Sequence, residues 1–161
     1  MFDLCEGRKG QQMAGRNDGR EHAGHDGRAG GLLRQADALL TDSAWEHEPG
    51  ERFRTAYLAA LRGAGAMIAL TGADRAPRAR SRSAWVLLRR ASPEFAMWAD
   101  YFEAHSQLRA DLEAGLDRAI TDTRADEFCS RVGAFLYDVD DALVAAAKTR
   151  PQPSRDRDMT A

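Results

Sequence analysis

The sequence feature that most limits the possible fold is the spacing of apolar side chains near the C-terminus. Between residues 124 and 148, apolar residues recur every three or four positions, which places them on one face of an α-helix. This face comprises Phe128, Val132, Phe135, Leu136, Val139, Leu143 and Ala146. We therefore predict a long helix with one face turned to a hydrophobic core. Either Thr121 or Thr123 can cap it, and Asp126 stands at a capping-box distance from Thr123.

The same period runs through three upstream segments. Helices are expected over residues 31–45, about 51–70 and 92–115, and the third of them can bend at Ser106. Gly115 followed by an apolar residue resembles a helix C-terminus. The alternation of apolar and polar residues that is typical of strands is missing. We therefore predict an all-α bundle of four to five helices.

The segment SRSAWVLLRRASPEFAMWADYF, residues 81–102, joins two of these helices. Ser83 can cap a short helix, and the Ser-Pro-Glu triplet at 92–94 can start the next one. Four residues of the second piece share one helical stripe, which we expect to face the core: Phe95, Trp98, Ala99 and Phe102. More generally, the tryptophans and tyrosines stand at helical spacing and are predicted to be core residues.

A chain of 161 residues is long enough for one domain with its own core. Residues 1–31 contain eight of the fourteen glycines and few residues to bury. We expect residues 1–30 to be a disordered Gly/Arg-rich leader, residues 31–149 to form the bundle and residues 150–161 to be a disordered tail. Met13 is an alternative to Met1 as the initiator.

Several classes of protein are disfavoured by composition. No apolar run approaches the roughly 20 residues that span a bilayer, and the N-terminus lacks the basic flank and apolar stretch of a signal peptide. We therefore expect a cytoplasmic protein without a membrane partner. Cys5 and Cys129 form no disulfide framework or metal-ligand cluster, and Cys129 is predicted to be a small core residue. No cofactor and no metal site are predicted.

Positive charge is concentrated in one interval, although the formal net charge of the chain is only −2. From residue 75 to residue 90 there are six arginines and no acid, whereas residues 91–141 hold twelve acids and four arginines. Arginine forms bidentate contacts with phosphate. The candidates for phosphate or nucleic-acid binding are Arg75, Arg78, Arg80, Arg82, Arg89 and Arg90. A solvated loop is the alternative, because the whole chain is rich in arginine and poor in lysine.

Two further groups have both a functional and a structural interpretation. His105 lies at the edge of an apolar stripe, where a hydrogen-bonded structural histidine is favoured over a catalytic one. The acids at 138, 140 and 141 could bind a divalent ion, but a solvated helix face is favoured because no second acidic motif stands nearby.

Three segments resemble a small bacterial branch of the HEPN superfamily. They are AYLAALRGAGAMIAL (56–70), SRSAWVLLRRASPEFAMWADYFEA (81–104) and ADEFCSRVGAFLYDVDDAL (125–143), and the resemblance covers about residues 32–143. It implies a helical bundle that is often dimeric. Many HEPN domains are RNases of toxin-antitoxin or defence systems, with an arginine, four to six residues and then a histidine on a helix. Others have lost this signature and serve as binding modules.

The RNase signature has two formal matches, both in the leader. Arg20 and His25 are separated by four residues, and Arg16 and His22 by five. The surrounding glycines argue against the rigid helix that this chemistry needs. No arginine stands at that distance before either histidine of the bundle.

We therefore predict a non-catalytic HEPN-like module that binds nucleotide, RNA or a partner protein, with no catalytic residue assigned. A HEPN-type RNase of a toxin-antitoxin or defence system and a dimeric structural scaffold are the alternatives. The small residues of the second helix let another helix approach closely, and together with the resemblance they predict a symmetric homodimer.

Overall fold

The structure, a computed structural model, describes residues 27–75, 83–116 and 119–151. These ranges contain helices and no strand, so the predicted all-α fold is confirmed. In chain order the elements are α2 (Arg28–Ser43), α3 (Pro49–Thr71), the 3₁₀ turn η2 (Ala73–Arg75), α4 (Ala84–Ala91), the 3₁₀ turn η4 (Pro93–Phe95), α5 (Ala96–Ala104), α6 (Ser106–Glu113) and α7 (Asp122–Thr149). Among the described helices, none is long and apolar enough to cross a membrane.

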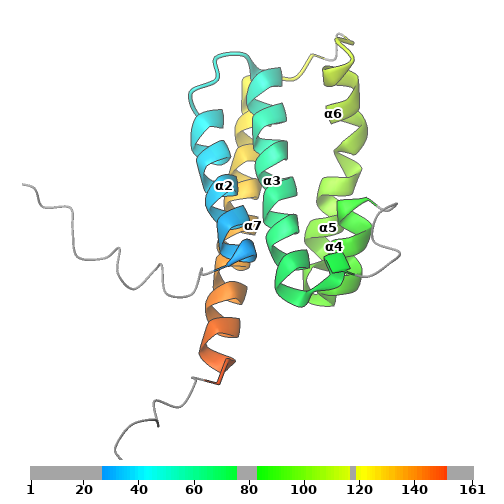
Figure 1. Cartoon of the computed structure of the whole chain (residues 1–161). Helices are drawn as coiled ribbons and strands as arrows, with labels where there is room; N and C mark the ends of the chain where they lie inside the picture. The colour runs from blue at the N-terminus through cyan, green and yellow to red at the C-terminus, as the bar shows by residue number, and fades with distance from the viewer. Residues whose placement is uncertain (1–26, 76–82, 117–118, 152–161) are drawn as a thin grey trace, which may run out of the picture.

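Three long helices form the framework of the bundle. α2, α3 and α7 lie side by side and contact one another (Figure 1). The shorter helices α4, α5 and α6 form a second group, in which α4 and α6 contact α3. The largest side chains of the core are fully buried where these helices meet: Phe53, Tyr57, Phe102, Phe128 and Phe135.

α3 is central because its small side chains admit close neighbours. A Cβ atom at the buried Gly63 would lie 2.5 Å from Leu136 Cδ2 and 2.8 Å from Phe135 Cε1, both on α7. These separations are shorter than van der Waals contact, so α7 occupies the space that glycine leaves. The alanine and glycine face of α3 thus packs against a helix of the same chain. A homodimer stays a prediction, and this face no longer indicates where two copies would meet.

The predicted junction around residues 81–102 is confirmed in its described part. The Ser83 hydroxyl accepts a hydrogen bond from the Val86 N–H at 3.2 Å and caps α4. Pro93 begins the 3₁₀ turn that leads into α5. The predicted stripe faces the core, with Phe95, Ala99 and Phe102 buried and Trp98 half-buried.

The predicted third helix is divided at His105 into α5 and α6, close to the expected bend at Ser106. α6 ends at Glu113, and the predicted terminal glycine, Gly115, follows two residues later with a left-handed φ of 69°. The Leu116 N–H donates to the Asp111 carbonyl at 2.9 Å, which satisfies an end group of the helix.

Thr121 caps α7 by accepting from the Arg124 N–H at 3.2 Å. The capping box proposed for Thr123 is wrong, because the Asp126 carboxylate instead accepts from Arg52 Nη1 of α3 at 2.7 Å. Arg52 also donates to the carbonyl oxygens of Glu46 and His47. This one side chain therefore ties the α2–α3 turn to the start of α7.

Two aromatic residues depart from the predicted core assignment. Trp45, just after α2, is 80% exposed, and Tyr137 on α7 is 67% exposed. Tyr137 stands next to the apolar face of α7 but not on it. α2 begins at Arg28, inside the predicted leader, and Gly30 is buried. The rest of the predicted leader and most of the predicted tail lie outside the described residues.

Three polar side chains form a buried network between α3, α4 and α6. Trp85 Nε1 donates to the Tyr57 hydroxyl at 2.8 Å, and this hydroxyl lies 2.8 Å from Ser106 Oγ. The Tyr57 hydroxyl also lies 3.3 Å from the Phe102 carbonyl oxygen, to which it can donate. The network fixes α4 and the α5–α6 junction against α3.

Replacing Tyr57 by phenylalanine should lower the free energy of unfolding by about 1–2 kcal/mol, because the buried indole N–H of Trp85 loses its acceptor. Denaturant unfolding measures this loss. Tyr137→Phe is the matched control, since Tyr137 is 67% exposed and its substitution should leave the unfolding midpoint unchanged. Equal stability of Tyr57→Phe and the unaltered protein would contradict a role for the hydroxyl.

Candidate functional site

The predicted arginine candidates fall into two groups. Arg75 is exposed and ends η2, directly before residues 76–82. Arg78, Arg80 and Arg82 lie outside the described residues. The segment that contains them leaves η2, which contacts α3, and enters α4 at Ser83. Helices that pack on each other therefore hold both of its ends.

Arg89 and Arg90 lie on the last turn of α4. Arg89 Nε donates to Asp100 Oδ1 at 2.9 Å and its Nη2 donates to Glu103 Oε2 at 2.6 Å, both on α5. The interval from residue 75 to residue 90 contains no acid, but two carboxylates contact Arg89 in the folded protein. A phosphate that bound Arg89 would therefore have to displace both. Arg90 is exposed.

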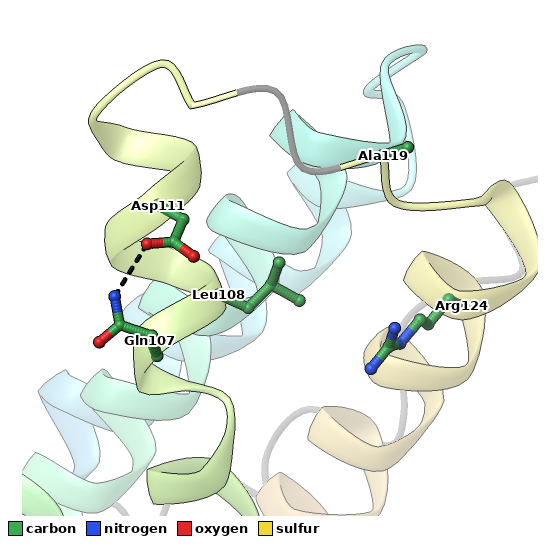
Figure 2. A pocket seen from close by; sticks show the side chains of 5 residues that line it. All are labelled: Gln107, Leu108, Asp111, Ala119 and Arg124. Atoms are coloured by element: carbon green, nitrogen blue, oxygen red, sulfur yellow. Dashed lines mark hydrogen bonds between the residues drawn. The ribbon is translucent and has the colours of Figure 1, made fainter.

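A cavity of about 360 Å³, here called the α6–α7 cavity, opens between α6 and the first turn of α7. Its lining residues are Gln107, Leu108, Asp111, Ala119 and Arg124. The Asp111 side chain is buried, and its Oδ1 accepts from Gln107 Nε2 at 2.8 Å. Figure 2 shows the Arg124 side chain extending from α7 toward α6. The cavity thus has a carboxylate on one wall and a guanidinium on the other.

The Tyr101 ring of α5 lies beside a histidine ring and an arginine guanidinium. The Tyr101 ring centroid lies 4.6 Å from that of His105, and the Arg131 guanidinium carbon lies 6.0 Å from the Tyr101 centroid. Burial raises the pKa of the Tyr101 phenol, although Arg131 and Arg124 act in the opposite direction. The phenol is therefore neutral at pH 7, and it can donate a hydrogen bond but cannot serve as a base.

A second cavity, of about 540 Å³, lies between α2, α3 and α7. Its lining residues are Leu40, Ser43, Ala44, Arg52, Asp126, Cys129 and Ser130. Cys129 is half-buried and packs against the edge of the hydrophobic core, which it was predicted to join. Burial raises the pKa of its thiol, although the Ser43 hydroxyl at 3.7 Å lowers it. The thiol is therefore protonated at neutral pH, which makes it a weak nucleophile.

Asp138 and Asp141 near the middle of α7 are exposed, as predicted for a solvated helix face. Asp138 Oδ2 accepts a hydrogen bond from Trp98 Nε1 of α5 at 2.8 Å. This contact ties α5 to α7. In the part of the chain that the structure describes, no group of three or more His, Cys, Asp or Glu residues is placed to hold a metal ion.

Comparison with protein-family models matches residues 43–140, more than half of the chain, to the SAV_6107-like HEPN family. The chain belongs to this HEPN family. The matched range runs from the last residue of α2 through α3 to α6 and most of α7. No curated protein and no solved structure matches the chain.

Of the two described histidines of this HEPN domain, His105 occupies a structural position. His105 Nδ1 lies 2.7 Å from the Tyr101 carbonyl oxygen, and its ring packs against Phe53 and Phe128. This is the hydrogen-bonded setting predicted for it. His47 is exposed in the α2–α3 turn. The two formal matches to the HEPN RNase signature, Arg16 with His22 and Arg20 with His25, lie outside the described residues.

Sequence reasoning missed the α6–α7 cavity of the HEPN domain. A signal existed, because Asp111 stands three residues after Leu108, on the apolar side of its helix, where burial of a carboxylate is costly without partners. Gln107 stands four residues before Asp111, the spacing at which helical side chains meet. Nothing in the sequence pattern connected either residue with Arg124 on the last helix.

Proposed function

We propose that this HEPN domain binds single-stranded RNA through its phosphates and does not cleave it. The observation that carries this proposal is the position of the arginine-rich segment 75–82. Four of its eight residues are arginines and none is an acid. Arg75, its first residue, is exposed at the end of η2, and Ser83, which directly follows the segment, is exposed at the start of α4.

Electrostatics favours this segment over the two arginines of α4. Each arginine that neutralises a phosphate releases counterions, and this release supplies most of the sequence-independent affinity for nucleic acid. Arg89 is already paired with two carboxylates, so it contributes less to such binding. We therefore assign the phosphate contacts to Arg75, Arg78, Arg80 and Arg82, with Arg90 as an exposed neighbour.

The positions of the histidines in the helical bundle support the part of the proposal that excludes cleavage. RNase chemistry of the HEPN type needs an arginine and a histidine that converge from a rigid helix on one phosphodiester. Neither histidine of α2–α7 follows an arginine at the family spacing. The His105 ring is held by a backbone carbonyl and packed among aromatic rings.

The experiment is a salt series of RNA binding, followed by fluorescence anisotropy of a short single-stranded RNA. The fourfold variant Arg75→Ala, Arg78→Ala, Arg80→Ala, Arg82→Ala should bind weakly. The slope of log affinity against log salt should become shallower by roughly 0.7 per lost phosphate contact, hence by about 2 to 3 in total.

The matched control replaces the same four arginines with lysine. This variant keeps every charge, so its salt slope should stay that of the unaltered protein even if its affinity is lower. Equal binding by the alanine variant and the unaltered protein would overturn the proposal. In that case a partner protein, a free nucleotide or a scaffold role would have to replace RNA.

A further inference from the structure

We propose that the end of the bundle around Trp45 is a docking surface for an arginine-rich segment of a partner protein. This inference goes beyond the binding of RNA and concerns a different part of the molecule. The surface, here called the Trp45 surface, comprises residues 42–54, at the turn between α2 and α3, and residues 122–127, at the start of α7. Figure 1 shows this turn and the start of α7 at the same end of the bundle.

Trp45 is the large apolar side chain of this surface. It is 80% exposed, whereas Trp85 is buried and Trp98 is half-buried. Tryptophan is one of the residue types that contribute most of the binding energy in protein–protein interfaces. An exposed tryptophan keeps a large apolar area in water until a partner covers it. The Trp45 ring therefore has the exposure and the chemistry of an interface anchor.

Hydrogen bonds hold the backbone on both sides of Trp45. The Trp45 N–H donates to the Asp42 carbonyl oxygen at 3.0 Å. Arg52 Nε donates to the Glu46 carbonyl oxygen at 3.1 Å, and its Nη2 donates to the His47 carbonyl oxygen at 3.4 Å. A partner therefore meets a turn that is already ordered, which reduces the entropic cost of binding.

The cavity of about 540 Å³ between α2, α3 and α7 borders this turn, because Ala44, the residue before Trp45, is part of its lining. Leu40 of α2 and Cys129 of α7 also line it, and the Asp126 carboxylate stands on its wall. An arginine side chain combines an apolar stem with a charged head. Such a side chain can place its methylene groups against Leu40 and its guanidinium near Asp126.

Charge decides which kind of partner fits the Trp45 surface. Residues 42–54 and 122–127 together hold seven acids and three arginines. One of these arginines, Arg52, has a side chain that is only 14% exposed and is paired with Asp122 and Asp126. The excess of negative charge opposes nucleic acid and attracts a basic segment. Arginine suits this surface best, because its guanidinium also stacks on the face of an indole ring.

The Trp45 surface lies far from the segment to which we assign RNA binding. The turn precedes α3, and Arg75 follows it, so the 23 residues of α3 separate them. A helix of this length spans about 34 Å. Charges in solution are screened over about 10 Å at 0.1 M salt. RNA and a basic partner segment can therefore be bound at the same time.

The test uses a short, end-blocked and fluorescently labelled peptide of alternating arginine and glycine. Its binding to the full chain is followed by fluorescence anisotropy at low salt. Trp45→Ala should weaken binding about 5-fold or more, as expected for the loss of one cation–π contact. Tyr137→Ala is the matched control, because Tyr137 is an aromatic residue that is 67% exposed but lies in the middle of α7. It should leave peptide binding unchanged.

A pair of charge variants tests the acids independently of Trp45. The double variant Asp42→Asn, Glu48→Gln removes two exposed carboxylates of the Trp45 surface. It should weaken peptide binding and reduce its dependence on salt. The double variant Glu94→Gln, Asp141→Asn removes two exposed carboxylates elsewhere and should change neither.

Several results would overturn the assignment. They are an absence of peptide binding at low salt, an equal loss in Trp45→Ala and Tyr137→Ala, and displacement of the peptide by single-stranded RNA. Light scattering that shows copies of the chain associating until Trp45 is replaced would also overturn it, because the occupant would then be a second copy. RNA binding should be the same in Trp45→Ala and the unaltered protein, so the docking surface and the proposed function can fail separately.

Discussion

Replacing Phe102 by alanine is expected to lower the free energy of unfolding by about 3–5 kcal/mol, the largest effect of any substitution considered for this protein. Phe102 is fully buried at the centre of the aromatic core. Its ring lies within 6.0 Å, centroid to centroid, of five others: Trp85, Trp98, Tyr101, Phe128 and Phe135. Alanine would remove contacts to α4, α5 and α7 together and leave a cavity between them.

Chemical denaturation of Phe102→Ala measures this loss. Met97→Ala is the control, because Met97 is an apolar residue of the same helix but is 84% exposed. Its unfolding midpoint should differ little from that of the unaltered protein. A Phe102→Ala protein that loses less than about 1 kcal/mol, below the range for truncated core aromatics, would mean that α5 does not pack as described.

The second large effect is expected at Gly63, where Gly63→Leu should cost about 3 kcal/mol or more through overpacking. A Cβ atom alone would stand 2.5 Å from Leu136 Cδ2, so the larger side chain must push α3 and α7 apart. Thermal unfolding should show a lower midpoint temperature. Crosslinking and limited proteolysis should show that α7 packs less tightly against α3 than in the unaltered protein.

Gly65 offers a matched control two residues away on the same helix. A Cβ atom there would meet Leu32 Cδ1 at 3.6 Å, an ordinary contact. Gly65→Ala should therefore stabilise the protein by up to about 1 kcal/mol, because alanine has the higher helix propensity. If Gly63→Ala and Gly65→Ala behaved alike, the close approach of α3 and α7 would be refuted.

Helical periodicity was sufficient to predict most of this fold, because the buried faces of α3, α5 and α7 follow it closely. Ser83 and Gly115 could also be placed, since helix caps require particular residue types. Helical periodicity did not predict the role of a residue whose side chain contacts another helix. Thr121 and Thr123 are equivalent by local spacing, and only the position of Arg52 on α3 explains why Asp126 does not complete a capping box.

The candidate site was harder to predict for the same reason. Charge along the sequence identified the arginine interval, but Arg89 meets Asp100 and Glu103 only after α4 and α5 fold against each other. The α6–α7 cavity joins Asp111 with Arg124, and a turn and a helix start separate them in the chain. Periodicity describes the faces of single helices and carries no information about which faces meet.

The central claim is that this HEPN domain holds RNA without cutting it. The most direct measurement recovers end-labelled single-stranded RNA from its complex with the full chain, after long incubation at low salt, and resolves it on a denaturing gel. The account predicts full-length RNA from the unaltered protein and equally from His22→Ala and His25→Ala. Discrete fragments that disappear with either histidine substitution would contradict it and would make the N-terminal Arg and His pairs a catalytic site.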